Sequence, residues 1–435
     1  MSLVNLGDGG PRGYNKQVSD SPFLSSPILP DKNPFEDDFD QAPINLDDET
    51  RYMDVEGNVL EPTVTQAMPG EPESTGRCRE LNLRYDRILQ EKRHSWTSHL
   101  RLLTEIGAGG QGVVYLTERR GADGFTLPVA LKVFSPERYA TPVHYDSDMA
   151  RIGRVAAAVA QIQHENLLVV ENFLDRDRIR MMVMEWVEGY DLRRLLKPNL
   201  LTNLEPHFTA KRWEYINDVL ITKGPVQPRF RSGFAVAIVR ECLEALAAMH
   251  RQNIVHSDIK PGNIMLKRTG HSKIIDIGSA FAISDPPQKR TCTPTYAALE
   301  VLEGGEITPR SDLASLGFVL LELLAGRPIF AGMNDYKELV QAKRTIKNRL
   351  EEFVPKELAD NEILMSLIAG MIDPDPQTRI ADAESANLIE FGAAAFHRQL
   401  VKNDLSTEYE NDLRIWVDEL LAIEIDHPEI LELPE

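Results

Sequence analysis

The segment Ile254–Leu266, with the sequence IVHSDIKPGNIML, places several polar side chains between two short apolar runs. Asp258, Lys260 and Asn263 form its polar centre. Short apolar runs of this kind predict buried strands, and a charged side chain is costly to bury unless it has a partner. The pattern therefore favours a fold that holds this polar loop between two buried strands, and a solvated surface loop is the alternative.

A second acidic position follows on the same stretch of chain. Asp276 comes directly after the isoleucine pair in the sequence IIDIGSA. Mg²⁺ takes one or two protein oxygens and otherwise binds water and substrate phosphates, and Asn263 and Asp276 can supply those oxygens. Asp258 then remains to orient an attacking hydroxyl group and accept its proton, while Lys260 can neutralise charge on a moving phosphoryl group.

Gly107, Gly109 and Gly112 recur in the sequence IGAGGQGVVY with the spacing G-x-G-x-x-G. A dinucleotide-binding turn with this spacing leads from a strand into a helix, whereas here the β-branched pair Val113–Val114 predicts a second strand. Backbone N–H groups without side chains can approach phosphate oxygens closely. The motif therefore predicts a phosphate-covering turn between two strands, and a plain hairpin is the alternative.

Lys132 stands in the otherwise apolar run VALKVF. Because an unpaired lysine is costly to bury, it either reaches solvent from a sheet edge or is aimed at phosphates. Further along, a strand ending at Glu185 loosens into the sequence WVEGYDL. Backbone groups at such a break can bind a flat base, and Asp191 can reach a ribose hydroxyl group.

Periodicity divides the chain into a strand-rich first part and a helix-rich second part. Strands are predicted at Leu102–Ile106, Val113–Glu118, Val129–Phe134, Leu168–Leu174 and Arg180–Glu185, with a helix over Asp148–Ile162. Apolar residues then recur at helical spacing over Phe234–His250, Asp312–Leu324, Ile363–Ile372 and Ala381–Leu400. This order of elements predicts an α+β protein with two lobes.

The charge of the chain is concentrated at its ends. The net charge is -19 over 435 residues; residues 1–75 hold 15 acidic side chains against 4 basic ones, and residues 403–435 hold 11 against 1. These ends disfavour nucleic acid as a partner, because like charges repel phosphates. The longest apolar stretch, Leu313–Ala325, is too short to span a bilayer. Three cysteines without metal-binding spacing are typical of a cytoplasmic protein.

Taken in order, these motifs resemble the eukaryotic-type (Hanks-type) serine/threonine protein kinase family over roughly residues 100–400. Three further motifs extend the resemblance: TPTYAALE ends an activation segment, SDLASLG carries Asp312 to brace the catalytic loop, and DPDPQTRI supplies Arg379 to pair with Glu300. The resemblance implies a bilobal protein-kinase fold, with a small β-rich N-lobe and a larger α-helical C-lobe. It also implies transfer of a phosphoryl group from ATP, with Mg²⁺, to serine or threonine hydroxyl groups of a protein substrate.

The same resemblance assigns roles to the candidate residues. The implied catalytic residues are Asp258 as the base, Lys260, Asn263 and Lys132, and the implied Mg²⁺ ligands are Asn263 and Asp276. The implied ATP-binding residues are Gly107, Gly109, Gly112, Val114, Ala130, Lys132, Met184, Glu185, Val187 and Asp191. Small-molecule kinases of similar fold usually lack counterparts of Lys260 and Asp312, so a protein substrate is favoured.

The resemblance also sets the expected boundaries. We expect a disordered acidic tail over residues 1–77, a flanking helix over 78–98, the N-lobe over 99–188, the C-lobe over 189–402 with an insert at 198–233, and an acidic extension over 403–435. The insert carries a group of basic side chains, which stay solvated, bind an acidic partner or dock the chain's own acidic ends: Lys211, Arg212, Lys223, Arg229 and Arg231.

Two positions depart from the family pattern. The family pairs its strand lysine with a helix glutamate, but residues 150–155, where it should lie, contain none. Asp148 lies two turns before Val155 on the same helix face. One hypothesis is that Asp148 replaces the missing glutamate, and the other is that activity is reduced. Ser257 replaces an arginine that grips a phosphorylated activation segment, so weak control by phosphorylation is expected. A nucleotide-binding pseudokinase acting as a scaffold is therefore an alternative function, and a small-molecule kinase is another.

Overall fold

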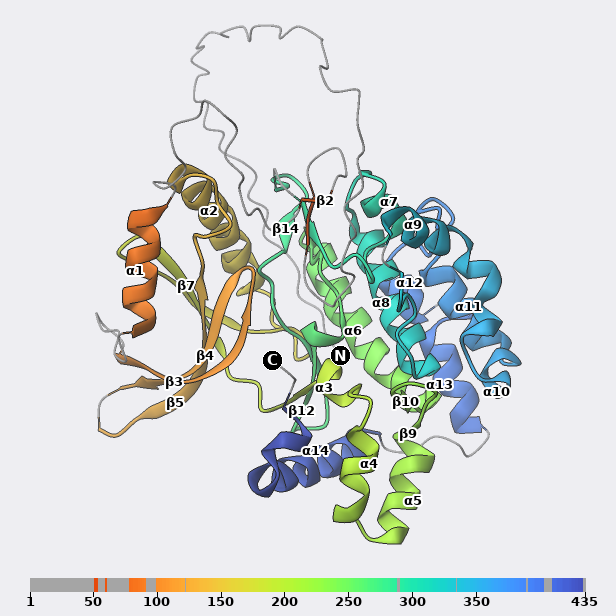
Figure 1. Ribbon diagram of the computed structural model, residues 1–435. Helices are drawn as coiled ribbons and strands as arrows, with labels where there is room; N and C mark the ends of the chain where they lie inside the picture. Colours follow the sequence, from red (N-terminus) through yellow and green to blue (C-terminus); the bar gives the residue numbers. More distant parts are fainter. Residues whose placement is uncertain are drawn as a thin grey trace, which may run out of the picture. The chain divides into compact units, whose positions relative to one another are not determined.

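The computed structural model describes residues 51–53, 59–60, 78–90, 99–121, 123–287, 290–333, 335–388, 390–402 and 409–432. Its first lobe is built on an antiparallel sheet of five strands in the order β3-β4-β5-β7-β6 (Figure 1). The strands are β3 His99–Gly109, β4 Gly112–Arg120, β5 Thr126–Phe134, β6 Val170–Arg176 and β7 Ile179–Glu185. Each predicted strand overlaps one of these.

Two helices pack on this sheet. Helix α1, Arg79–Gln90, lies against β7 and buries its apolar stripe, Leu81, Tyr85 and Ile88. Helix α2, Pro142–Val159, packs against β6. It starts earlier than the predicted Asp148, because the Thr141 side chain accepts a hydrogen bond from the His144 N–H and Pro142 suits the first turn. Apolar periodicity does not register such a cap.

The second lobe is mainly helical. Its helices are α6 Ser232–Arg251, α7 Leu299–Leu302, α8 Pro309–Ala325, α9 Tyr336–Thr345, α10 Lys356–Ala359, α11 Glu362–Met371, α12 Ala383–Leu388 and α13 Ala393–Lys402. Helices α6 and α8 pack together at its centre and are buried along most of their length. Among the described residues, no helix is both long and apolar enough to cross a membrane.

The prediction of one helix over Ala381–Leu400 was wrong. The chain instead forms α12 and α13, with Gly392 just before the second helix. A Cβ atom at Gly392 would lie 2.7 Å from the carbonyl oxygen of Ala386. The chain therefore turns back tightly on α12 at a place where only glycine fits, and the periodicity on both sides concealed the break.

Short strands in the second lobe flank the polar loop that contains Asp258, Lys260 and Asn263. Strand β12, Ile264–Lys267, pairs with β13, Ser272–Ile274, and with β8, Gly189–Asp191. Strand β11, Ile254–Val255, pairs with β14, Phe281–Ala282. The loop therefore leaves one buried strand and enters another, as its apolar flanks predicted.

The insert and the C-terminal residues contact one another. Helix α3, Leu192–Leu195, precedes the insert. The insert contains α4 Leu200–Leu204, α5 Ala210–Val219, β9 Ile221–Lys223 and β10 Pro228–Phe230, and the C-terminal part forms α14 Tyr409–Asp426. The Arg212 guanidinium donates to both carboxylate oxygens of Glu419, at 2.9 Å from Nε to Oε1 and 2.8 Å from Nη2 to Oε2. Tyr190 donates its hydroxyl hydrogen to Glu424 at 2.6 Å.

Short 3₁₀ helices cover Glu205–His207, Pro261–Asn263, Ile346–Glu352 and Pro428–Ile430.

Two short strands come from the N-terminal part of the chain. Strand β1, Arg51–Met53, pairs antiparallel with β15, Arg290–Cys292, and with β2, Val59–Leu60. Both strands fall in the segment predicted to be a disordered acidic tail. The other residues before Cys78 lie outside the described residues.

Candidate active site

Asp258 is buried in the loop between β11 and β12. The Thr293 hydroxyl donates to Asp258 Oδ1 at 2.7 Å, and Lys260 Nζ lies 3.2 Å from Asp258 Oδ2. Lys260 also donates to the Thr293 hydroxyl oxygen at 3.2 Å. A hydroxyl group is thus held between a carboxylate and an ammonium group, which is the environment that proton removal from an attacking hydroxyl requires.

Asp312, on α8, fixes the backbone of this loop. Its carboxylate accepts hydrogen bonds from the backbone N–H groups of His256 and Ser257, both at 2.8 Å, and lies 2.9 Å from His250 Nε2. Ser257 has a φ of 70°, which is unfavourable for a residue with a side chain. Because Asp312 is fully buried, its hydrogen bonds hold this conformation and set the position of Asp258 next to it.

Asn263 and Asp276 lie beside each other at the end of this loop. The Asn263 amide group donates through Nδ2 to the Asp258 carbonyl oxygen at 2.7 Å and to Asp258 Oδ2 at 3.2 Å, so its hydrogen-bond donors are used while its amide oxygen is an acceptor. The Ile275 N–H donates to the Asn263 carbonyl oxygen at 2.8 Å and so brings Asp276 alongside. An amide oxygen and a carboxylate suit a hard cation such as Mg²⁺. Within the described residues, no larger cluster of His, Cys, Asp and Glu is arranged to hold a metal.

Asp276 is paired with the strand lysine. Asp276 Oδ1 accepts from Lys132 Nζ at 2.6 Å and from the Gly278 N–H at 2.9 Å. Burial opposes the charge of this carboxyl, but Lys132 and these hydrogen bonds outweigh it and hold the pKa of Asp276 at about 2. Asp276 is therefore an anion at neutral pH, which is the form that binds a cation.

The glycine motif forms the turn between β3 and β4. Gly112 has a φ of 136°, and a Cβ atom there would lie 1.9 Å from the Val133 carbonyl oxygen, so only glycine fits. At Gly107 and Gly109 a Cβ atom would meet nothing within 4 Å. The turn therefore packs tightly on β5 at one position and leaves open space at two others, a shape that suits the phosphates of a nucleotide.

The other predicted nucleotide contacts fall into two groups. Ala130 and Met184 face each other across β5 and β7 and are buried, as is Val187, while Val114 is half-buried. By contrast, Glu185 pairs through its side chain with Lys273. Asp191 caps α3 by accepting from the Arg194 N–H at 3.0 Å, and burial raises the pKa of Asp191. These two carboxylates are engaged within the protein.

A model of the protein kinase domain matches residues 100–390. The chain belongs to the protein kinase family. The predicted resemblance and the bilobal α+β fold are thereby confirmed.

Curated relatives agree with this family. The kinase domain is 31% identical over 235 residues to the serine/threonine-protein kinase PrkC of Bacillus subtilis, covering 53% of this chain and 31% of that protein. It is 33% identical over 233 residues to the serine/threonine-protein kinase PknL of Mycobacterium tuberculosis, covering 52% and 49%. It is 27% identical over 311 residues to the serine/threonine-protein kinase pkn2 of Myxococcus xanthus, covering 69% and 32%. The chain thus spans less than half the length of each of these relatives.

The end of the kinase activation segment is held by two basic side chains of the second lobe. Arg379 donates to both carboxylate oxygens of Glu300 at 2.7 Å, which confirms the predicted pair. Lys343, on α9, donates to the Thr295 carbonyl oxygen at 2.7 Å and lies 3.7 Å from the centre of the Phe318 ring. Burial holds the pKa of Lys343 well below its ordinary value. These contacts fix the segment that contains Thr293, and so help to place the Thr293 hydroxyl group next to Asp258.

Asp148 does not take the place of the missing helix glutamate. Its Oδ1 accepts from Arg151 at 2.8 Å, and its Oδ2 accepts from the Tyr139 hydroxyl group at 2.6 Å and from Arg138 at 3.4 Å. Lys132 pairs instead with Asp276 and with the side chain of Gln111. The hypothesis that Asp148 substitutes is therefore wrong in this structure, because neighbouring donors already surround its carboxylate.

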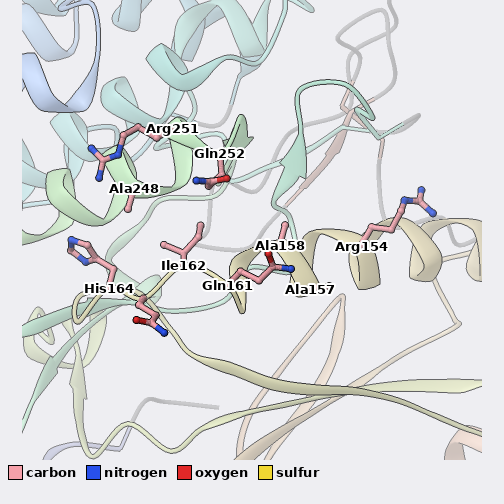
Figure 2. Close-up of a pocket in the computed structure, with 10 residues that line it drawn as sticks. Arg154, Ala157, Ala158, Gln161, Ile162, His164, Ala248, Arg251 and Gln252 are labelled. Atoms are coloured by element: carbon pink, nitrogen blue, oxygen red, sulfur yellow. The ribbon is translucent and has the colours of Figure 1, made fainter. Parts of the chain in front are cut away.

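Figure 2 shows a second hollow, a cavity of about 610 Å³ where the C-terminal ends of α2 and α6 meet. It is lined by Arg154, Ala157, Ala158, Gln161, Ile162, Gln163, His164, Ala248, Arg251 and Gln252. None of the predicted site residues lies in this lining, so the cavity is distinct from the kinase site.

Sequence reasoning missed three residues that contact the site. Thr293 begins the TPTYAALE motif, so its position near the end of the activation segment was the available signal. Gln111 lies inside the glycine motif, but the motif's spacing assigns a role to the glycines and none to the residue between them. Arg151 lies within residues 150–155, where the family has its helix glutamate. A basic residue at this place does not predict a contact with the activation segment.

Proposed function

We propose that this chain is a Mg²⁺- and ATP-dependent serine/threonine protein kinase. The observation that carries the proposal is the connected set Lys132, Asp276, Asn263 and Asp258. Lys132 donates a hydrogen bond to Asp276. The N–H of Ile275, the residue before Asp276, donates to the Asn263 carbonyl oxygen, and the Asn263 amide group donates to the Asp258 carbonyl oxygen and carboxylate. A scaffold has no need to retain all four of these side chains.

Each side chain has a distinct part in the proposed reaction. Asp258 accepts the proton of the substrate hydroxyl group, and Lys260 next to it compensates the charge of the transferred group. Asn263 and Asp276 hold Mg²⁺, which when bound neutralises charge on the phosphates. Lys132 binds the α- and β-phosphates, and Gly107, Gly109 and Gly112 supply backbone N–H groups above them. Ala130, Met184, Val187 and Val114 form the apolar walls for the base.

A protein substrate is favoured over a small molecule by the activation segment. Its end is held by the pair of buried Arg379 with half-buried Glu300 and by Lys343, and a segment fixed in this way can support an extended peptide. A second candidate function is a nucleotide-binding pseudokinase, favoured by one observation: Lys132 has no carboxylate partner on α2. We further infer that the domain boundaries are those expected, with residues 99–188 and 189–402 as the two kinase lobes, and a cytoplasmic location stays a prediction.

The test is an assay of the whole chain with labelled ATP and a generic protein substrate, in Mg²⁺ and after chelation with EDTA. We expect label on serine or threonine in Mg²⁺ and none in EDTA, because the Asn263 and Asp276 oxygens need the cation to engage the phosphates. Nucleotide binding without any transfer would instead support the pseudokinase. Label on a small hydroxylated acceptor but not on protein would overturn the choice of substrate.

A further inference from the structure

We propose that Gln111, at the tip of the glycine turn, replaces the missing helix glutamate as the residue that orients Lys132. The inference rests on the proposed function, since it names a positioning residue for the same reaction. Gln111 Oε1 accepts a hydrogen bond from Lys132 Nζ at 2.8 Å. Lys132 therefore has two side-chain acceptors in this structure, the Asp276 carboxylate and the Gln111 amide.

The other end of the same amide contacts the activation segment. Gln111 Nε2 donates to the Ser279 hydroxyl oxygen at 2.8 Å. One side chain thus joins three parts of the site: the glycine turn, the strand lysine and the residues that follow Asp276. In this respect it does what a helix glutamate would do, because it ties Lys132 to a second element of the fold and restricts its rotamers.

The backbone around Gln111 is built for this position. The Gln111 carbonyl oxygen accepts from the Ser135 N–H at 3.0 Å, which anchors the turn to the end of β5. Across the site, a Cβ atom at Gly278 would lie 2.1 Å from Gln111 Oε1 and 2.7 Å from Lys132 Nζ. Glycine at position 278 therefore leaves the space that the Gln111 amide fills.

Helix α2 cannot supply the acceptor itself. Arg151 is buried on the face of α2 toward the activation segment and donates to the Ala280 carbonyl oxygen at 3.1 Å. An arginine side chain has no hydrogen-bond acceptor to offer to Lys132. Helix α2 therefore contacts the activation segment through Arg151, while the glycine turn binds Lys132 through Gln111. We infer that these two residues together replace the missing helix glutamate.

The test compares Gln111→Ala, Gln111→Glu and the control Gln161→Ala, an exposed glutamine at the end of α2. Phosphoryl transfer and ATP affinity are measured on the full chain. We expect Gln111→Ala to lower kcat about 10- to 100-fold with little change in KM for ATP, because a hydrogen bond to a charged group is lost where charge develops. Gln111→Glu should restore kcat, since a carboxylate of the same length also accepts from Lys132. Gln161→Ala should match the wild type.

A double-mutant cycle on unfolding free energy gives a readout that needs no catalysis. Gln111→Ala and Ser279→Ala should be non-additive, because both remove the same hydrogen bond. Unchanged or raised kcat in Gln111→Ala, or additive stabilities, would overturn the inference and leave the proposed function standing. If the wild type transfers no phosphate but the cycle shows coupling, the contact stands and the proposed function fails.

Discussion

Replacing Asp258 with asparagine (Asp258→Asn) is expected to lower kcat for phosphoryl transfer by about 10²- to 10⁴-fold. An amide has nearly the same shape as the carboxylate and still accepts the hydrogen bond that the Thr293 hydroxyl donates at 2.7 Å. It cannot take a proton from a substrate hydroxyl group, and it no longer compensates the charge of Lys260, 3.2 Å away. The loss should therefore fall on turnover rather than on folding.

The measurement separates binding from chemistry. ATP affinity of Asp258→Asn should stay close to that of the wild type, because the proposed function assigns the phosphates to Lys132 and to a cation at Asn263 and Asp276. Asp360→Asn, an exposed change at the end of α10, serves as the control and should leave kcat unchanged. A variant at Asp258 that kept kcat within about tenfold of the wild type would remove Asp258 from the role of base.

The polar loop could be predicted from the sequence because its determinants are local. Apolar residues on both sides of Asp258 and Asn263 specified β11 and β12, and the same pattern holds in the structure. The five strands of the first lobe were likewise predicted from short, largely apolar runs, and β5 and β7 are buried along most of their length. By contrast, the pairing of Arg379 with Glu300 was available only through the family resemblance, since the two residues lie far apart in the chain.

The network around Lys132 could not be predicted from local pattern. Gln111 reaches Ser279 across 168 residues of sequence, and both are ordinary polar residues in loops. Their contact depends on how the glycine turn folds onto the second lobe, which no periodicity encodes. Asp148 illustrates the converse error. The Arg151 donor lies three residues further along the same helix, a spacing at which Asp148 and Arg151 are neighbours, whereas the Tyr139 hydroxyl that also takes the carboxylate comes from packing that spacing does not reveal.

The C-terminal helix α14 was expected only as part of an acidic extension. Its acidic residues meet basic and hydroxyl partners on the second lobe: Arg212 with Glu419, Arg268 with Asp418, and Tyr215 with Asp412. Such exposed or half-exposed pairs contribute little each. Trp416 is different, because its side chain is fully buried and packs edge-on against Phe234 of α6, with ring centres 6.2 Å apart.

Trp416→Ala should therefore destabilise the chain by about 3–5 kcal/mol, the usual cost of removing a buried aromatic side chain and leaving its cavity. The measurement is a shift of the urea unfolding midpoint for the full chain. Trp416→Phe is the matched variant. Within the described residues the indole N–H of Trp416 has no acceptor, and phenylalanine removes that unpaired donor while keeping an aromatic ring against Phe234. We expect Trp416→Phe to lose much less stability than Trp416→Ala. If α14 were only a loosely attached extension, both variants would unfold at the wild-type midpoint, and the helix would contribute nothing to the stability of the kinase fold.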